Sequence, residues 1–397
     1  MNPLALTRFT ATSAIGRGLG ETFAALRAER TGLAPCSFET VTLDTCVGEV
    51  RGVDEAPLPA PLAEFECRNN RLALIGLSQD GFIEATERCA GRYGRDRVGI
   101  FLGTSTSGIL ETELAYRRRD PASGALPAGF RYCGAHNTFS LAAFAQRALS
   151  LSGPAVVISS ACSSSAKVFA SAQRAIEAGL IDAAVVGGVD SLCLTTLYGF
   201  HSLQLVSRTP CRPFDVARDG ISIGEAAAFA LLERPGTSLD AEQVLLLGTG
   251  ESSDAYHMSS PPPDGRGAAA AMRQALKAAG LAAGDIEYIN FHGTGTPSND
   301  QAEGRAVASV LGAQVPGSST KGATGHTLGA AGALEAVISA LALTHAVMPA
   351  GINTEQVDPE LPVHYLRRNR SAPLSRVMSN SFGFGGSNCS LIFGRAG

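Results

Sequence analysis

A cysteine at the start of a predicted helix is the first candidate for chemistry in this sequence. Residues 154–169 read as a short buried apolar strand, a turn of small residues that contains Cys162, and then a helix. A thiol in this place lies near unpaired backbone N–H groups and the positive end of the helix dipole, which favours the thiolate. Cys162 is therefore a candidate nucleophile, although a small cysteine packed behind a strand is the ordinary alternative.

Two histidines and a lysine are candidates to act with this thiol. His292 begins the turn His-Gly-Thr-Gly-Thr-Pro, and Lys321 and His326 lie in the turn Lys-Gly-Ala-Thr-Gly-His. Glycines in such turns allow a substrate to approach the backbone closely. Glu335 follows His326 by nine residues on the next predicted helix, so it could pair with that histidine. Taken singly, each histidine could equally be structural or at the surface, and Lys321 could be a solvated charge.

The turns follow apolar runs that alternate with helical patterns through most of the chain. Strands are predicted at 3–14, 98–102, 154–159, 182–190, 226–233, 244–250, 286–291, 377–382 and 389–393. Helices are predicted at 19–31, 71–92, 110–118, 139–149, 163–179, 266–279 and 328–345, with a capping-box-like helix start at Asp300 and Glu303. Residues 32–62 are expected to be an irregular surface excursion. This alternation indicates an α/β fold with parallel βαβ units. Ligands gather at the carboxyl ends of parallel strands, so these turns and the Gly-Phe-Gly-Gly turn of Phe384 could converge there.

The second half of the chain repeats the pattern of the first half, without residue identity, which indicates an internal duplication. A chain of 397 residues exceeds the usual size of a single hydrophobic core. We therefore predict two domains, residues 1–237 with the cysteine and residues 238–397 with the two histidines, joined by the link at 234–240.

Composition excludes several classes of function. Apolar residues make up 45% of the chain and charged residues 17%, as in an ordinary globular protein. The net charge of −4 does not indicate the basic surface that binds nucleic acid. The nine cysteines form no CxxC pair, and an odd number of them suits reduced thiols in the cytoplasm. We find no signal-peptide pattern and no uninterrupted apolar run of about 18 residues, so neither secretion nor membrane insertion is expected.

Four ordered motifs carry a resemblance to a known family. The chain contains the run SSACSSSA, the turn HGTGTPSND, the segment STKGATGHTLGAAGALEA and the ending MSNSFGFGGSN. Together they resemble a β-ketoacyl-acyl-carrier-protein synthase, a condensing enzyme of the thiolase superfamily with a Cys-His-His triad. The resemblance covers essentially the whole chain. It implies a duplicated thiolase-like fold with five layers, αβαβα, and one active site per subunit at a dimer interface.

The resemblance also implies a role for each candidate residue. Cys162 matches the nucleophile that takes the acyl group from the phosphopantetheine of the carrier protein. His292 and His326 match the pair that assists decarboxylation of the malonyl thioester and stabilises the enolate. Lys321 matches the lysine that organises this pair, and Glu335 matches the carboxylate partner of that lysine.

Further positions are implied around the substrate. Phe384 matches a gating phenylalanine whose backbone N–H forms the oxyanion hole with that of Cys162. Thr294 and Thr296 match pantetheine-binding threonines, and Phe382 is assigned to substrate binding. No metal and no nicotinamide or flavin cofactor is implied, because loss of carbon dioxide itself generates the carbanion. The implied partners are acyl carrier protein and a second chain, either identical or ketosynthase-like.

Some positions depart from the usual pattern of the family. The segment RDGISIGEAAAF lacks the second glycine of the usual GEGA, and Ser298-Asn299 stands where a Leu-Gly pair is common. With GGVDSLCLTTLYGF, these features resemble ketosynthases of secondary pathways, such as those for aryl polyene pigments, more than those of housekeeping fatty-acid elongation. The arginines 117–119 are candidates to dock an acidic carrier protein, with a solvated helix end as the alternative.

Three other functions are considered. A non-catalytic chain-length partner would share the fold and lack the nucleophile, whereas this chain has Cys162 and both histidines. A thiolase would need a second cysteine near the C-terminus, for which Cys389 is the candidate, although it lies inside a strand pattern. A cysteine hydrolase would account for the cysteine and a histidine, but not for the Lys-Gly-Ala-Thr-Gly-His turn or for GFGG.

Overall fold

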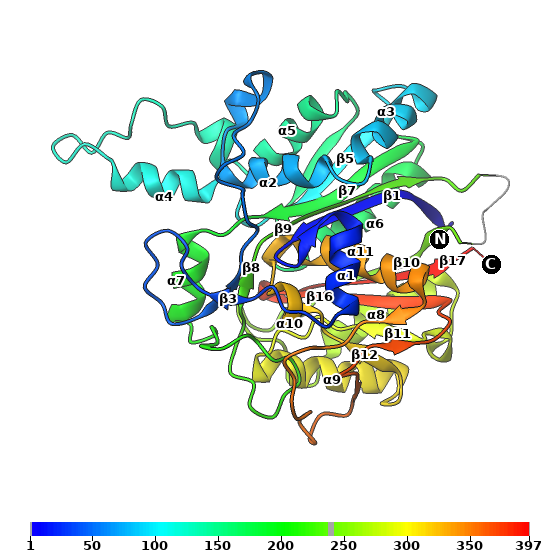
Figure 1. Cartoon of the computed structure of the whole chain (residues 1–397). Coiled ribbons are helices and arrows are strands. Elements are labelled where there is room, and N and C mark those ends of the chain that lie inside the picture. The colour runs from blue at the N-terminus through cyan, green and yellow to red at the C-terminus, as the bar shows by residue number, and fades with distance from the viewer. Residues whose placement is uncertain (1, 237–241, 397) are drawn as a thin grey trace.

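The computed structural model describes residues 2–236 and 242–396, and its architecture is the predicted duplicated, five-layered α/β fold. Figure 1 shows two layers of strands with helices above, between and below them. The main strands of the first half are β1 (Leu4–Ser13), β5 (Val98–Gly103), β6 (Ala155–Ile158), β7 (Ala183–Asp190) and β9 (Ala226–Glu233). Those of the second half are β10 (Val244–Ser253), β11 (Tyr288–Asn290), β12 (Pro316–Ser318), β16 (Arg376–Gly383) and β17 (Ser387–Arg395).

The two halves have the same topology, which confirms the internal duplication. The first sheet has the order β1-β9-β7-β5-β6, and the second has the order β10-β17-β16-β11-β12. Numbered along each half, both orders read 1-5-4-2-3, and corresponding neighbours run in the same relative directions. The sheets meet where β1 pairs with β10 at Leu4–Leu246 and Ala5–Leu245.

Helices form the other three layers. The central layer contains α1 (Gly18–Arg27), α6 (Ser164–Glu177) and α11 (Ala331–His345) (Figure 1). One outer layer contains α2 (Arg68–Leu77), α3 (Phe82–Tyr93) and α5 (Ser140–Ala148), and the other contains α8 (Arg266–Ala279) and α9 (Pro297–Leu311). The remaining helices are α4 (Ile109–Arg117), α7 (Leu194–Ser202) and the single turn α10 (Lys321–Thr324). Short strands complete the chain: β2 (Gly16–Arg17), β3 (Ala34–Pro35), β4 (Cys46–Gly48), β8 (Ile223–Gly224), β13 (Val347–Met348), β14 (His364–Tyr365) and β15 (Arg370–Ser371).

The central helices α6 and α11 approach each other through small residues. A Cβ atom added at Gly332 of α11 would lie 2.6 Å from the backbone nitrogen of Ala166 in α6. The N–H of Ala333 donates to Oγ of Ser165, at 2.8 Å. Gly103 at the end of β5 and Gly188 inside β7 make similar room, because a Cβ at Gly103 would lie 2.4 Å from the nitrogen of Ser165 and one at Gly188 would lie 2.5 Å from Cβ of Ser165. Small residues therefore bring the start of α6, and with it Cys162, close to the second half.

Several predicted elements differ from those observed. The helix expected over 71–92 is two helices, α2 and α3, because Asp80 and Gly81 take left-handed backbone conformations between them. The strand expected to be buried at 154–159 is β6, which is half-buried because it lies at the edge of its sheet. The excursion at 32–62 also carries buried residues, including Phe38 and Val47. Helix α7 was not predicted.

Two further expectations concern the ends of elements and the domain boundary. Asp300 and Glu303 do not begin a helix, because α9 starts at Pro297 with Thr296 as its N-cap. Their carboxylates instead accept hydrogen bonds from the turn that carries His292. The boundary between 237 and 238, and most of the link at 234–240, lie outside the described residues.

One helical segment is long and apolar enough to cross a membrane by composition. It runs over Leu328–His345, and 89% of it is buried inside the protein. The segment is interrupted by Glu335 and Thr344, so it is not the uninterrupted apolar run whose absence the sequence indicated. All thirteen residues from Ala331 to Leu343 are buried in the structure, as in the core helix of a globular domain.

We predict that Gly332→Ala destabilises the fold, because the added methyl group would meet the backbone of α6 at 2.6 Å. Overpacking of this kind typically costs about 1–3 kcal/mol of unfolding free energy. The matched control is Gly199→Ala in α7, where an added Cβ has nothing within 4 Å, so the substitution should be neutral or slightly stabilising. Urea denaturation of both variants measures the difference, and equal stability would contradict the close approach of α6 and α11.

Candidate active site

Cys162 lies in the sharp turn between β6 and α6. Ala161 before it has a φ of +53°, a left-handed conformation that is unusual for alanine. The turn is held by Ser164, whose Oγ accepts the N–H of Ser160 at 2.8 Å and donates to the carbonyl of Ala161 at 2.5 Å. Ser163 is the N-cap residue of α6. The predicted position of the cysteine, directly before a helix, is therefore confirmed.

The resting thiol, however, is not a thiolate. Burial raises the pKa of Cys162 to about 11, and the positive charge of Lys321 and the N–H groups of Phe384 and Cys162 itself only partly oppose this effect. The expectation that the helix N-terminus would favour the thiolate is wrong for this closed site, because loss of solvation outweighs the dipole. A proton acceptor is therefore needed next to the sulfur.

His326 supplies such an acceptor. Its Nε2 atom lies 3.1 Å from Sγ of Cys162, and the ring of His292 stands edge-on to it, with 5.3 Å between ring centroids. Burial holds the pKa of both histidines well below the usual value, and the charge of Lys321 lowers each further. Both rings are therefore neutral at pH 7, and the structure brings Cys162, His292 and His326 together as the sequence predicted.

Lys321 lies behind the two histidines and is paired with Glu335. Its ammonium group contacts Oε1 of Glu335, donates to the carbonyl of His292 at 2.5 Å and lies 3.4 Å from Nδ1 of the same ring. An ammonium group can only donate, so Nδ1 of His292 is the acceptor and the ring proton is on Nε2. Burial raises the pKa of Glu335 to about 7, against the opposing effect of Lys321. Glu335 therefore pairs with Lys321, as the resemblance implied, and the pairing with His326 suggested by spacing is wrong.

Two buried carboxylates of α9 hold the turn that begins at His292. Glu303 accepts the N–H groups of His292 and Gly293, at 2.8 and 2.7 Å, while Asp300 accepts that of Thr294 at 3.0 Å. Burial raises the pKa of Glu303 to about 7 and also raises that of Asp300. The sequence analysis missed this role. The signal was present in two acidic residues three positions apart directly after a glycine-rich turn.

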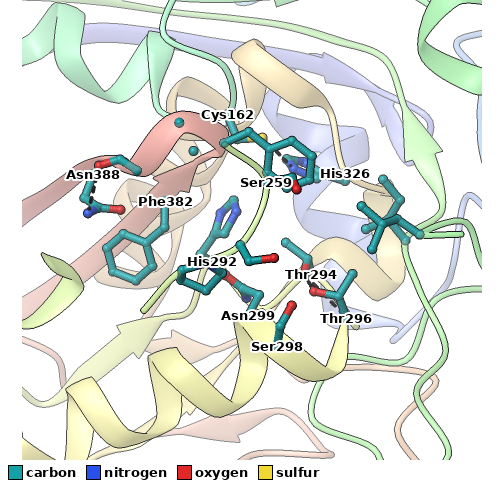
Figure 2. A pocket seen from close by; sticks show the side chains of 18 of the residues that line it. Cys162, Ser259, His292, Thr294, Thr296, Ser298, Asn299, His326, Phe382 and Asn388 are labelled. Atoms are coloured by element: carbon teal, nitrogen blue, oxygen red, sulfur yellow. Dashed lines mark hydrogen bonds between the residues drawn. The ribbon is translucent and has the colours of Figure 1, made fainter. Parts of the chain in front are cut away.

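The triad lies at the inner end of a pocket (Figure 2), whose lining includes Phe200, Thr294, Thr296, Phe382 and Phe384. The hydroxyl groups of Thr294 and Thr296 are hydrogen-bonded to each other at 2.9 Å. The ring of Phe384 packs on Phe200 of α7, with centroids 5.5 Å apart, and that of Phe382 lies 6.0 Å from His292. The pocket thus contains all the residues predicted to bind substrate.

Residues that no motif singled out complete the lining. They come from the loop after β10, the start of α9 and the start of β17: Asp254, Ser259, Ser260, Pro261, Ser298, Asn299 and Asn388. Figure 2 labels Ser259, Ser298, Asn299 and Asn388 among them. Asn388 donates to Asp254 at 2.7 Å, and the N–H of Gly385 donates to the carbonyl of Met258 at 2.7 Å. These bonds tie the loop after β10 to the turn that carries Phe384.

The side chains of Cys162, His292 and His326 also offer the geometry of a metal site, since their ligand atoms lie within 4.8 Å of one another. The electrostatics oppose a cation there. Nε2 of His292 carries a proton, and the ammonium group of Lys321 lies directly behind the ring. We therefore expect the triad to act without a metal.

The other candidates lie away from this pocket. Cys389 is fully buried in β17, opposite Glu251 of β10, and does not line the pocket, so the second cysteine that a thiolase needs is not in place. The arginines 117–119 are exposed at the end of α4, which projects from the body of the protein in Figure 1.

Comparison with known proteins places both halves in one family. The model described as the N-terminal domain of beta-ketoacyl synthase matches residues 77–237, and that of the C-terminal domain matches residues 244–355. A mitochondrial 3-oxoacyl-(acyl-carrier-protein) synthase of Arabidopsis thaliana is 40% identical over 61% of this chain. That alignment spans only 56% of the plant protein. A 3-oxoacyl-(acyl-carrier-protein) synthase 2 of Synechocystis is 31% identical over 98% of this chain and 97% of its own length.

A solved structure extends the similarity over the whole fold. The structure is entitled "Ketosynthase (ApeO) in Complex with its Chain Length Factor (ApeC) from Xenorhabdus doucetiae". A chain of it is 39% identical to this protein, with a TM-score of 0.89, and the match covers 100% of this chain and 98% of that one.

We predict that, in a His326→Ala background where no imidazole accepts the proton of the thiol, alkylation of Cys162 by iodoacetamide accelerates about tenfold per pH unit from pH 7 until the rate levels off near the pKa of about 11. Because the folded-state pKa is raised, the reactive thiolate is scarce at pH 7 and increases as the pH rises. Mass spectrometry of the Cys162 peptide measures the rate, in a Cys133→Ser background because Cys133 is exposed. A rate independent of pH between 6 and 9 in this background would instead indicate a thiolate that is already formed in the resting site.

We also predict that Lys321→Met is strongly destabilising, because it leaves the carboxylate of Glu335 buried without its partner. Removal of one member of a buried ion pair typically costs about 3–5 kcal/mol of unfolding free energy. The double variant Lys321→Met/Glu335→Leu should recover part of this loss, since no uncompensated charge remains. Urea denaturation of the single and double variants measures both values, and a double variant less stable than Lys321→Met would refute the pairing.

Proposed function

Because the chain belongs to the β-ketoacyl synthase family, we propose that it catalyses decarboxylative Claisen condensation. The substrates are an acyl group bound to Cys162 and a malonyl group on acyl carrier protein, and the product is a β-ketoacyl-carrier protein. The observation that carries this proposal is the Sγ–Nε2 contact of 3.1 Å between Cys162 and His326, with His292 and Lys321 directly behind it. A non-catalytic chain-length partner would not require a nucleophile placed against a proton acceptor in this way.

The first step is acyl transfer to the cysteine. Sγ of Cys162 attacks the carbonyl carbon of the acyl thioester while its proton passes to Nε2 of His326. The N–H groups of Cys162 and Phe384 already point to the sulfur, so they are placed to stabilise the oxyanion. The intermediate collapses with loss of the pantetheine thiolate, which takes up the proton from His326. The acyl group is then a thioester of Cys162.

The second step forms the new carbon–carbon bond. The bond between the malonyl carboxylate and its α-carbon breaks, carbon dioxide leaves, and the electron pair becomes the enolate of the remaining thioester. The proton on Nε2 of His292, fixed there by Lys321, is available to stabilise the enolate oxygen, with His326 beside it. The α-carbon attacks the acyl carbonyl, the bond to Sγ breaks, and the sulfur regains a proton from solvent. No metal, nicotinamide or flavin takes part in this scheme.

The carrier arm would enter through the pocket of Figure 2. Thr294 and Thr296, only 6% and 8% exposed, line this pocket with the triad, where their hydroxyl groups can meet the amide groups of pantetheine. Phe382 and Phe384 line the same pocket. The exposed arginines 117–119 are proposed to dock the acidic carrier protein, since opposite charge promotes such encounters.

A second chain is proposed to pair with the edge of the first sheet. Strand β6 is the outermost strand of this sheet, and all four of its apolar residues are only half-buried. In the segment before α5, the aromatic side chains of Tyr132 and Phe139 are 55% and 45% exposed. An open apolar edge of this kind favours pairing with another chain. The partner is either an identical chain or a ketosynthase-like one, as in the complex of a ketosynthase with its chain length factor described above.

The pathway and the cellular location are proposed from the sequence. The departures at Ser298-Asn299 and in RDGISIGEAAAF favour a secondary pathway of the aryl polyene type, and the reduced cysteines favour the cytoplasm. Mass spectrometry of the acyl group trapped on Cys162 in cells would identify the chain length and saturation of the natural substrate.

We predict that the purified protein, given acyl- and malonyl-carrier protein, releases carbon dioxide and forms a β-ketoacyl product. Cys162→Ala should abolish acylation, because no nucleophile remains. His292→Ala should retain acylation, since its ring does not contact the sulfur, but lose at least about a hundredfold in condensation. Intact-mass spectrometry follows acylation, and radiolabelled malonyl groups report carbon dioxide. Failure to condense any acyl donor would refute the proposed enzyme, and full condensation by His292→Ala would refute the assigned role of that residue.

A further inference from the structure

A buried aspartate on the other side of the nucleophile organises the loop after β5. Asp190 ends β7, is fully buried and accepts five hydrogen bonds from residues 104–106. Its Oδ1 accepts the N–H groups of Ser105 and Thr106 and the hydroxyl groups of Thr104 and Thr106, all at 2.7–2.8 Å. Its Oδ2 accepts the hydroxyl group of Ser105 at 2.7 Å. None of these contacts belongs to the substrate pocket or to the Lys321–Glu335 pair.

Each of the three hydroxyl groups donates to Asp190 and also accepts a backbone N–H. Oγ1 of Thr104 accepts the N–H of Ser107 at 3.0 Å, and Oγ1 of Thr106 accepts that of Ser191 at 3.3 Å. Oγ of Ser105 accepts the N–H of Gly329 at 3.2 Å. Each hydroxyl group is therefore held from two sides, by the carboxylate that it donates to and by the N–H that it accepts. Asp190 in this way holds three hydroxyl groups in fixed orientations.

Only one of the three hydroxyl groups reaches the second half of the chain. Ser105 lies at the end of β5, and its partner Gly329 lies three residues after His326, in the turn that leads into α11. The approach is close, since a Cβ atom at Gly329 would lie 2.7 Å from Oδ2 of Asp190 and 2.9 Å from the nitrogen of Ser105. The same loop also contacts the strand that leads to the nucleophile, because the N–H of Thr104 donates to the carbonyl of Ile158 at the end of β6, at 3.2 Å.

We propose that Ser105, oriented by Asp190, is a positioning residue that fixes His326 against Cys162. The inference rests on the proposed function in that His326 is taken to accept the proton of the thiol. Ser105 bonds to the turn of His326, while its neighbour Thr104 bonds to the strand that leads to Cys162. The hydroxyl group thus sets the register between the two halves where Sγ and Nε2 must meet. Other contacts also hold this turn, since the N–H of His326 donates to the carbonyl of Ser222 at 2.7 Å. Loss of the Ser105 hydroxyl group should therefore displace the ring of His326 without unfolding the site.

The test is the alkylation rate of Cys162 in Ser105→Ala, with Ser107→Ala as the matched control. Ser107 lies in the same loop, and its hydroxyl group donates to the carbonyls of Ala135 and Asn137 rather than to this network. We expect Ser105→Ala to slow alkylation at pH 8 by about tenfold, because the thiol loses a well-placed proton acceptor, and Ser107→Ala to stay within about twofold of the parent. Melting temperatures of both variants show whether the fold is retained, since a purely structural role would lower Tm without changing the rate.

A second pair of variants covers the case in which Ser105→Ala folds poorly. Ser105→Thr and Ser105→Val have nearly the same shape and differ in the hydroxyl group, so the threonine variant should alkylate at close to the parent rate and the valine variant about tenfold more slowly. Equal rates in this pair, or in Ser105→Ala and Ser107→Ala, would overturn the inference. Alkylation needs no carrier protein, so this outcome is independent of whether the protein condenses a given acyl donor.

Discussion

The buried ion pair between Lys321 and Glu335 is the interaction on which the rest of the site depends. The ammonium group of Lys321 fixes the tautomer of His292 and, together with burial, keeps both histidines neutral. A buried lysine is tolerated only when a carboxylate and good acceptors surround it, and here Glu335 and the carbonyl of His292 supply them. The pair thus places a positive charge behind the histidines without giving either of them a proton. Without it, burial would still oppose an imidazolium, but the tautomer of His292 would no longer be fixed.

The duplicated topology explains how residues from distant parts of the chain meet. In each half the third strand leads through a sharp turn into a central helix, which gives Cys162 before α6 and the turn of Lys321 and His326 before α11. The second strand of each half ends beside it, in the loop of Ser105 or in the turn of His292. Four equivalent strand ends therefore surround one site. Equivalent positions have taken different tasks, since one loop carries a histidine and the other carries hydroxyl groups bonded to Asp190.

The sequence predicts the position of the chemistry better than its surroundings. Cys162, His292 and His326 could be found because strand, small-residue turn and helix are local patterns, and the resemblance then supplied their roles. The partners of the buried carboxylates are harder to predict, because no local sequence pattern indicates which residue a carboxylate will contact. Spacing alone paired Glu335 with His326, whereas the rotation of α11 directs it to Lys321. Asp190 bonds to residues about 85 positions earlier in the chain, so only the folded sheet reveals its function. The sequence also overestimates the acidity of the Cys162 thiol, because the burial that raises its pKa cannot be inferred from the start of a helix.

These electrostatics favour a site that is neutral at rest and becomes charged only with substrate. Burial opposes the thiolate and both imidazolium ions. The backbone N–H groups of Cys162 and Phe384 already point to the sulfur, and the ring of His292, with its proton on Nε2, lines the pocket. An oxyanion or enolate that forms there meets fixed donors, whose orientation was established when the protein folded. A thiolate at rest would compete for the same donors and would be open to side reactions. The high pKa of the free cysteine is therefore compatible with catalysis, because the transition state receives the stabilisation that the resting thiolate does not.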